Sequence, residues 1–316
     1  MEIIKSIEKF KKLESSVITV GNYDGVHKGH QDVLKYLVKE GKKRGIPSCI
    51  ITFFPNPVYV LFNNDISINL QSIDSRLDSF KKVGIDKVLV IPFSKEFSKM
   101  SAESFADNII KKLFNPQLIS VGTNHYFGHN KEGDFNFLID FCKNNNIELH
   151  HPEMRKIDNQ LVSSSIIRKL IMDGRLQDVQ KLLGNFYGFE ATVVKGSQRG
   201  KSMKYPTANF IPNFNKQLVP GVGVYLTRVL IDDKKYFGMC NAGIRPTFNE
   251  KKFVMEVHIL SDKFGSLYDK NIYVEFLDKI RDEKKFDSKD LLIKQIENDK
   301  KVCIKLIDTF KEKYEI

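Results

Sequence analysis

The chain has few cysteines, no long apolar stretch and no low-complexity tract, so its sequence is that of an ordinary globular protein. Its 316 residues include only four cysteines, which lie far apart and form no C-x-x-C pair, so neither a zinc knuckle nor a small disulfide framework is indicated. No stretch reaches the apolar length needed to cross a bilayer, and there is no low-complexity tract. We therefore expect a cytoplasmic protein with a buried core and no membrane partner.

Basic residues are in excess, but they do not gather into a stripe that would bind nucleic acid. The formal net charge is +11 at pH 7, which attracts nucleic acid, a membrane surface or a small polyanion such as ATP without choosing among them. The lysines are scattered, and none forms a basic stripe interleaved with aromatic residues. A solvated lysine-rich surface is the better interpretation, so we expect no nucleic-acid partner.

The first half of the chain alternates short apolar runs with helical patterns. Apolar residues at three- and four-residue intervals predict the helices. This βαβ order favours an α/β domain with a doubly wound, Rossmann-like parallel sheet, whose ligand crevice lies at the carboxyl ends of the strands. We expect strands at 17–20, 49–53, 88–91, 118–121 and 147–149, and helices at 32–44, 75–83, 102–113 and 135–144.

After Gly184 the pattern changes to alternating, β-branched segments divided by Gly, Pro and Asp turns, which predicts a mostly antiparallel sheet or small β-barrel. Residues 288–310 return to helical spacing and predict a closing C-terminal helix. The two domains are expected at 1–184 and 185–316. The expected strands of the second domain are 191–195, 224–231, 236–241, 253–260 and 272–276.

The most informative segment, residues 21–30, reads GNYDGVHKGH and lies between an apolar run and an amphipathic stretch. A strand that turns through glycines into a helix presents backbone N–H groups and a positive dipole end to a phosphate. His27 and His30 add imidazole donors, while Gly25 and Gly29 let a polyphosphate approach the main chain. The alternative is a glycine-rich turn with surface histidines.

No Walker lysine follows this turn, and the His-x-Gly-His spacing instead resembles the nucleotidyltransferase superfamily. Within it, the motif is most similar to the adenylyltransferase module of the bacterial bifunctional riboflavin kinase/FAD synthetases. VSSSIIR (162–168) and GTNHYFG (122–128) resemble two further motifs of that family. Taken alone, the first is also an ordinary N-cap cluster and the second an ordinary strand exit.

The resemblance implies that the first domain joins FMN to AMP by in-line attack of the flavin phosphate on the α-phosphorus of ATP, with no protein nucleophile. It implies that His27, His30 and Arg168 are catalytic and that Phe127 binds flavin. It places the ATP and phosphate contacts at Gly21, Asp24, Gly25, Gly29, Asn124, Ser163 and Ser164. The chain departs from the family at Phe54 and Asn56, which replace an acid and an imidazole, and at His125, which replaces a phenylalanine.

In the second half, GSQRGKS (196–202) is not a Walker A loop, because three residues separate its glycines where four are required and Tyr205-Pro206 follows where a helix should begin. The longer string GSQRGKSMKYPTANF (196–210) resembles the riboflavin kinase signature. On an extended backbone Thr207 and Asn209 point to the same side, so their oxygens can share one cation. Family resemblance makes them Mg²⁺ ligands, and the alternative is a proline-initiated turn into a strand.

Alternation along 253–260 puts Met255, Val257 and Ile259 on one face and leaves Glu256 on the other. The resemblance makes Glu256 the catalytic base that accepts the proton of the riboflavin 5′-hydroxyl, whereas a solvent-facing acid is the ordinary alternative. It also implies that Arg281 and Glu283 bind flavin and that Gly196, Arg199, Gly200 and Lys201 bind ATP phosphates. Lys204 stands where the family usually has glycine.

We therefore predict a two-site enzyme that phosphorylates riboflavin to FMN and adenylylates FMN to FAD, with ATP as co-substrate and Mg²⁺ as cofactor at each step. One alternative keeps the kinase and treats the first domain as impaired or acting on another substrate, because of Phe54, Asn56 and His125. The other is a basic nucleic-acid-binding or regulatory protein without turnover, which the absence of a basic aromatic stripe disfavours.

Overall fold

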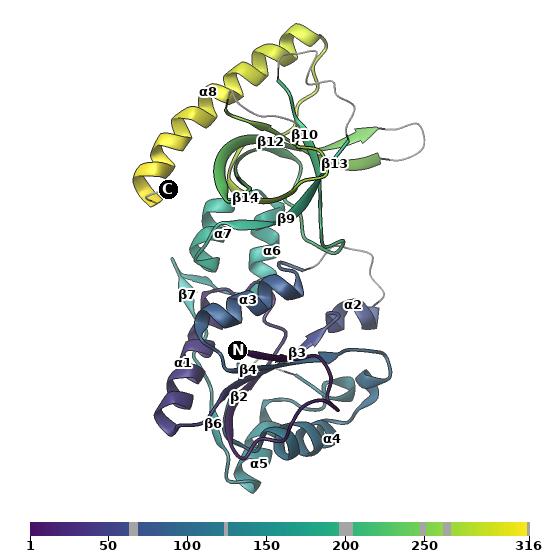
Figure 1. The fold of residues 1–316 in the computed structure, drawn as a ribbon, viewed down its shortest axis with the longest axis vertical. Coiled ribbons are helices and arrows are strands. Elements are labelled where there is room, and N and C mark those ends of the chain that lie inside the picture. Colours follow the sequence, from purple (N-terminus) through teal and green to yellow (C-terminus); the bar gives the residue numbers. More distant parts are fainter. Residues whose placement is uncertain (63–68, 123–125, 196–204, 247–250, 262–266, 315–316) are drawn as a thin grey trace. The chain divides into compact units, whose positions relative to one another are not determined.

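The structure is a computed structural model that describes residues 1–62, 69–122, 126–195, 205–246, 251–261 and 267–314 (Figure 1). The contacts within the chain divide it into two compact units, Met1–Ser164 and Ser165–Ile316. Helices α6 (Ser164–Met172) and α7 (Leu176–Leu183) precede the predicted domain boundary at residue 184. That boundary stays a prediction, and each unit is described below by itself.

The first unit contains a parallel six-stranded sheet in the order β1-β4-β3-β2-β5-β6, which confirms the predicted fold class. The chain builds β3 and β4 to one side of β2 and then β5 and β6 to the other, so the order reverses at the carboxyl end of β2. Its strands are β1 (Glu2–Ile4), β2 (Ser16–Val20), β3 (Ser48–Phe54), β4 (Lys87–Pro92), β5 (Pro116–Ser120) and β6 (Glu148–His150).

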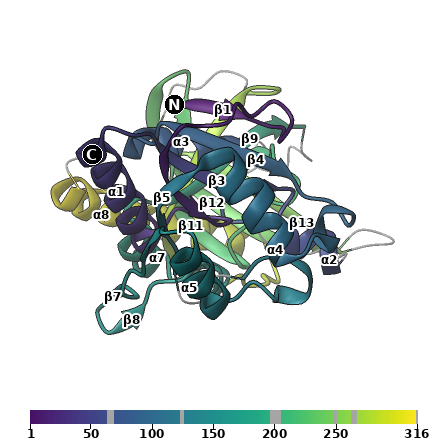
Figure 2. The same ribbon diagram turned by 90° about the horizontal axis from the view of Figure 1, so that it is seen from below.

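Helices cover both faces of this sheet, because successive strand residues point to opposite sides. In β3, Ile50 faces the cluster formed with α1 and α3, whereas Cys49 and Ile51 face the cluster formed with the helices after β4 and β5. Figure 2 shows these helices around the sheet. These helices are α1 (Lys28–Arg44), α3 (Ile73–Val83), α4 (Ala102–Phe105), the π-helix η2 (Ala106–Phe114) and α5 (Phe135–Asn144).

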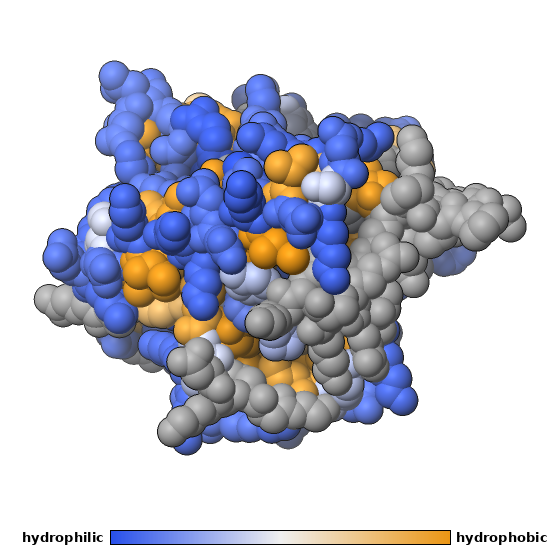
Figure 3. Space-filling view, turned by 90° about the horizontal axis from the view of Figure 1, so that it is seen from above, coloured by the Kyte–Doolittle hydropathy of each residue, from blue (hydrophilic) through white to orange (hydrophobic). Residues whose placement is uncertain are grey.

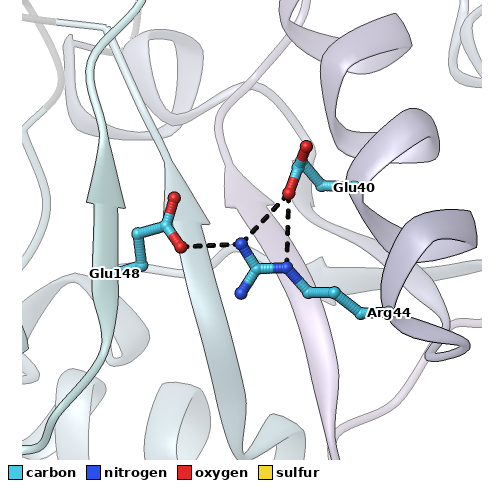
Figure 4. Close-up of polar contacts among 3 residues, drawn as sticks. All are labelled: Glu40, Arg44 and Glu148. Carbon is cyan, nitrogen blue, oxygen red and sulfur yellow. Dashed lines mark hydrogen bonds and ion pairs between the residues drawn. The ribbon is translucent and has the colours of Figure 1, made fainter.

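The last turn of α1 is tied to strand β6 by charge. Arg44 contacts Glu40 one turn earlier on the helix at 3.1 Å and Glu148 on β6 at 2.6 Å (Figure 4). Gly45 follows with a φ of 67° and donates its N–H to carbonyls of the last turn, which ends the helix in the usual left-handed cap. Three basic residues in this turn also suit the negative end of the helix dipole.

Several short elements of the first unit were not predicted. Strand β1 has three residues in a stretch that mixes charge with isolated apolar side chains, so it carries no period-two pattern. The helix expected at 102–113 is divided into α4 and η2. The remaining short elements are α2 (Pro57–Phe62), the 3₁₀ turns η1 (Phe97–Lys99) and η3 (His129–Lys131), and the hairpin of β7 (Lys156–Ile157) and β8 (Gln160–Leu161).

The second unit is a closed, antiparallel six-stranded barrel with the order β10-β13-β12-β11-β14-β9, followed by one long helix (Figure 1). Both the barrel and the closing helix were predicted. Strands β9, β12 and β14 are longer than expected, and β10 was expected only as extended backbone. The elements are β9 (Tyr187–Val194), β10 (Ala208–Pro212), β11 (Gly223–Ile231), β12 (Lys234–Pro246), β13 (Lys251–Ile259), β14 (Asn271–Arg281) and α8 (Lys289–Tyr314).

Alternation along the strands divides the apolar residues of the barrel between two cores. Inside, Tyr225 packs edge-on against Phe276, which contacts Phe189. Outside, Leu226 and Leu277 belong to the cluster that contains Cys303, Ile307 and Phe310 of α8. Helix α8 therefore covers one outer face of the barrel with an apolar stripe at helical spacing.

On the face seen from above, the hydrophobic residues that the structure describes form patches among hydrophilic ones (Figure 3). In the part of the chain that the structure describes, no helix combines the length and hydropathy needed to cross a membrane.

Candidate active sites

The turn after β2 places the first candidate site where the strand order of the sheet reverses. The turn leads directly into α1, and His27 is the N-cap residue of that helix. The His27 Nδ1 accepts the His30 backbone N–H at 3.2 Å, so the neutral ring carries its proton on Nε2. The arrangement thus combines a helix N-terminus with an imidazole in the donor tautomer.

The two predicted histidines lie together. Their rings are stacked, with centroids 3.5 Å apart and planes 15° apart. The Tyr23 ring meets His30 edge-on at 4.9 Å, and its hydroxyl is hydrogen bonded to Thr19 on β2. His27 is 5% exposed and His30 is partly buried, whereas the alternative interpretation requires histidines on the surface.

Asp24 anchors the turn from within. Both of its carboxylate oxygens accept the Leu70 backbone N–H at 3.0 Å, and one accepts the Gln71 N–H at 3.2 Å. Gly25 has a φ of 87°, and a Cβ there would lie 2.6 Å from a Leu70 methyl carbon, so both conformation and packing call for glycine. At 3% exposure, Asp24 supports the turn through backbone contacts, and its predicted contact with phosphate stays a prediction.

Two of the motifs singled out in the sequence meet at this turn. The Ser164 hydroxyl donates to the Asp24 carbonyl at 2.8 Å, although the residues are 140 positions apart. This contact ties the start of α6 to the glycine-rich turn. Ser163 precedes it directly, and Arg168 lies further along α6 in the second unit, so the predicted roles of these two residues stay predictions.

Arg76 supports the same turn and was missed by the sequence reasoning. It is 1% exposed, and its guanidinium donates to the backbone carbonyl of Asn22 at 2.7 Å and to the side-chain oxygen at 2.9 Å. On α3 it lies three residues after Ile73 and four before Phe80, on the apolar side of the helix. A charged residue within a helical apolar stripe was the signal that could have found it.

Asn56 and Phe127, two further residues singled out in the sequence, are both buried. The Asn56 amide is 6% exposed, donates to Asn69 at 3.1 Å and accepts the Val58 N–H at the start of α2, so it caps a helix. Phe127 is 8% exposed and packs with Phe105 and other aromatic rings of the core. Asn124 and His125 lie outside the described residues.

The second candidate site is a cavity of about 460 Å³ between the outer face of the barrel and α8. Strand β13 contributes Glu256 and His258 to its wall, while Met255, Val257 and Ile259 are buried, as the alternation predicted. The wall combines apolar, acidic and basic side chains, as is usual for sites that bind small organic molecules. It is formed by Tyr205, Thr207, Val224, Met239, Asn241, Glu256, His258, Arg281, Glu283, Lys284, Phe286, Ser288, Lys289, Leu292, Ile296 and Asp299.

The predicted base and metal ligands are neighbours. The Thr207 hydroxyl donates to Glu256 at 3.2 Å, and Asn209 stands directly opposite Glu256 in the antiparallel pair of β10 and β13. Directly opposed residues on paired strands place their side chains on the same side of the sheet. Since a hydroxyl can donate its proton and still offer lone pairs, Thr207 can hold the carboxylate and also ligate a cation.

His258, near the end of β13, contacts the segment that leads into β10. Its Nδ1 lies 2.9 Å from the Pro206 carbonyl oxygen, and because a carbonyl only accepts, Nδ1 carries the proton. The ring also meets Tyr205 edge-on at 5.3 Å. Burial lowers the pKa of His258 below its ordinary value, which favours the neutral ring.

The two predicted flavin residues line the same cavity. Arg281, at the end of β14, donates Nε and Nη2 to the Asp299 carboxylate of α8. Glu283 lies against the backbone of β12, because a Cβ on Gly243 would collide with its carboxylate. The predicted phosphate residues Gly196, Arg199, Gly200 and Lys201, and the departure at Lys204, lie outside the described residues.

The donor set suits a magnesium ion only if substrate completes it. Among the described residues, no group of three or more His, Cys, Asp and Glu side chains is placed to hold a metal. Thr207, Asn209 and Glu256 offer a hydroxyl, an amide and a carboxylate oxygen on adjacent strands. Oxygen ligands completed by phosphates and water are what Mg²⁺ prefers, so these residues fit that ion.

Comparisons with known proteins match both halves of the chain. The family model of FAD synthetase matches residues 9–166, and that of riboflavin kinase matches residues 183–307. The chain is 33% identical to the bifunctional riboflavin kinase/FMN adenylyltransferase of Buchnera aphidicola subsp. Schizaphis graminum, covering 95% of this chain and 96% of that protein. It is 32% identical to the protein of that description from Escherichia coli (strain K12), with the same coverage.

A solved structure shares the fold over nearly the whole chain. The crystal structure described as a macrolide-efflux protein from Streptococcus pneumoniae superposes with a TM-score of 0.85 at 30% identity, covering 95% of this chain and 97% of that one. The likeness supports the fold of both units.

Proposed function

This chain belongs to the family of bifunctional riboflavin kinase/FMN adenylyltransferases, and from that premise we propose that it uses a separate site in each unit to make FAD from riboflavin. The kinase reaction, which transfers the γ-phosphoryl group of ATP to riboflavin, takes place in the barrel unit. The adenylyltransferase reaction, which joins FMN to the AMP moiety of ATP and releases pyrophosphate, takes place in the parallel-sheet unit.

The observation that carries the assignment of the kinase site is the hydrogen bond from Thr207 to Glu256 in the wall of the cavity. Glu256 accepts the proton of the riboflavin 5′-hydroxyl as that oxygen attacks the γ-phosphorus. The Thr207 hydroxyl orients the carboxylate during this step. Thr207 and Asn209 would hold Mg²⁺, and that ion would supply positive charge to neutralise the phosphate oxygens of ATP.

In the first unit, the FMN phosphate attacks the α-phosphorus of ATP, and negative charge builds on the departing pyrophosphate. The Nε2–H of His27 and the ring of His30 stabilise that charge, together with the N-terminal N–H groups of α1. Asp24 and Arg76 hold the turn that carries these donors. No residue forms a covalent intermediate, so binding geometry supplies most of the catalysis.

The experiment supplies purified protein with riboflavin, ATP and Mg²⁺ and separates the flavins by chromatography over time. We expect FMN to appear first and FAD to follow, with one ADP released per FMN and one pyrophosphate per FAD. A second incubation starts from FMN and should give FAD alone. Protein that forms neither flavin would refute the proposal.

The departures from the family pattern define one further outcome. Asn56 is engaged in capping α2 and contacts Asn69, whereas the family usually has a histidine at this position. FMN without FAD would assign the kinase to the barrel and would show that the parallel-sheet unit is impaired or acts on another phosphorylated substrate.

A further inference from the structure

The cavity wall contains a buried carboxylate that the proposed kinase mechanism does not use. Asp299 lies in α8, is 2% exposed, and accepts Arg281 Nε at 2.9 Å and Nη2 at 2.8 Å. It also accepts the amide of Gln295, one turn earlier in the same helix, at 2.7 Å. A carboxylate this deeply buried is stable only when it is paired, so the three donors account for its charge.

This pairing fixes the plane of the Arg281 guanidinium inside the cavity. The Nε–Nη2 edge is held by Asp299, Nη1 donates to the Asp282 carbonyl at 2.9 Å, and the Phe286 ring centre lies 5.8 Å away. A bidentate Arg–carboxylate pair has one favoured geometry, unlike a lysine pair. Because Nε and Nη2 are paired with Asp299 and Nη1 donates to Asp282, a ligand in the cavity meets a face of the guanidinium rather than its paired edge. A planar cation of this kind suits a planar aromatic ring.

We propose that Asp299 is a positioning residue for flavin binding: it holds Arg281 in the orientation that receives the ring system of riboflavin. The inference rests on the proposed kinase function and goes beyond it by giving α8 a part in substrate selection. Helix α8 thus does more than cover the barrel, because it fixes a substrate-binding side chain on β14. Asp299 acts through Arg281, and Gln295 supports Asp299.

The second unit offers a matched control for the stability that such a pair contributes. Arg228 on β11 and Glu275 on β14 form another largely buried pair, with side chains 10% and 15% exposed. Arg228 also lies 5.5 Å from the Phe186 ring centre, as Arg281 lies near Phe286. Neither Arg228 nor Glu275 lines the cavity. Breaking this pair should destabilise the barrel without changing flavin binding.

The experiment uses the full chain. It compares D299N, R281Q and the double variant D299N/R281Q with the control variant E275Q. FMN formation gives kcat and the KM values for riboflavin and ATP, and quenching of flavin fluorescence gives riboflavin binding without ATP. Because one pair of charge-assisted hydrogen bonds is lost, D299N should raise the KM for riboflavin about tenfold and leave that for ATP within about twofold. E275Q should lower the melting temperature by about as much as D299N does, because each removes one partner of a buried ion pair, but it should change neither KM by more than about twofold.

The combination tests whether Asp299 acts through Arg281. Since coupled residues are not additive, adding D299N to R281Q should raise the riboflavin KM by less than about a further twofold. If D299N fails to fold, Gln295→Met replaces it, since removing one donor to Asp299 leaves the ion pair in place. That variant should raise the riboflavin KM about threefold, a smaller loss in proportion to one neutral hydrogen bond.

The outcomes separate this inference from the proposed function. Wild-type protein that makes no FMN would refute both. Active wild type together with variants that only lower the melting temperature, or that raise both KM values equally, would show that Asp299 merely fastens α8 to the barrel. Conversion of FMN to FAD by the same variants should stay unchanged, which controls for general damage to the chain.

Discussion

The two proposed phosphate sites are built from different parts of the polypeptide. In the parallel-sheet unit the turn after β2 brings N–H groups and the N-terminus of α1 to the site, and buried side chains such as Asp24 and Arg76 hold the backbone from behind. In the barrel unit the backbone is a regular sheet, and side chains on its outer face meet a helix across a cavity. FAD formation should therefore be sensitive to changes that displace the turn after β2. FMN formation should be sensitive to substitution of single side chains in the cavity.

The largest effect should come from Glu256→Gln, which removes the proton acceptor but keeps the size of the side chain. FMN formation should fall about 10²- to 10⁴-fold, the usual range for loss of a general base. Formation of FAD from FMN should not change, because the parallel-sheet unit is untouched. Both rates are measured by chromatography, with Glu275→Gln as the control acid in the same barrel. Loss of both reactions in a folded Glu256→Gln variant would contradict separate sites.

His30→Ala should give the reverse pattern with a smaller loss. Removing one donor to charge that builds on pyrophosphate should slow FAD formation about 10²-fold, while FMN formation continues. His129→Ala is the matched control, because His129 is exposed and its ring contacts the Ser98 carbonyl. Equal effects of the two variants would remove His30 from the site.

The sequence predicts features that depend on neighbouring residues, but not contacts between residues that are far apart in the chain. The shared side of Thr207 and Asn209 and the face that Glu256 occupies follow from strand periodicity and recognised motifs, both of which are local, whereas the pairing of β10 with β13 that brings Asn209 opposite Glu256 is not. The resemblance assigned Asp24 to phosphate, which stays a prediction, but nothing near Asp24 in the sequence reveals its bonds to the backbone of residues 70 and 71. The pair of Arg281 and Asp299 likewise needs β14 and α8 to be placed together. Periodicity specifies faces, whereas such partners come only from tertiary structure.

Asp24→Asn should test whether the first site depends on its anchored turn. An amide keeps one acceptor oxygen but loses the charge-assisted bonds to the Leu70 and Gln71 N–H groups, which should cost about 1.5–3 kcal/mol. Chemical denaturation measures this loss, and the KM for ATP in FAD formation should rise with it. Asp140→Asn, on α5, is the control. An unchanged unfolding midpoint would show that Leu70 and Gln71 do not need the carboxylate.

The smallest effect concerns one histidine in each unit. Burial lowers the pKa of His150, which is hydrogen bonded to Ser120, and that of His258, which is bonded to Pro206. As the pH falls below the ordinary histidine pKa of 6.5, these two histidines take up protons in the unfolded chain but stay largely neutral in the folded protein. The stability that the neutral rings contribute is thus complete above about pH 6.5 and is lost as the pH falls toward the lowered pKa values.

Hydrogen exchange at pH 7 and pH 5.5, with intrinsic exchange rates corrected for pH, can follow the two units separately in one sample. In wild-type protein, protection should fall on acidification in peptides from both units. His150→Gln should weaken the pH dependence only in peptides from residues 1–164, and His258→Gln only in those from the barrel, since glutamine does not titrate in this range. Equal responses of both units to either substitution would mean that the units unfold together. Independent folding of the two units could then not explain why their two activities are separate.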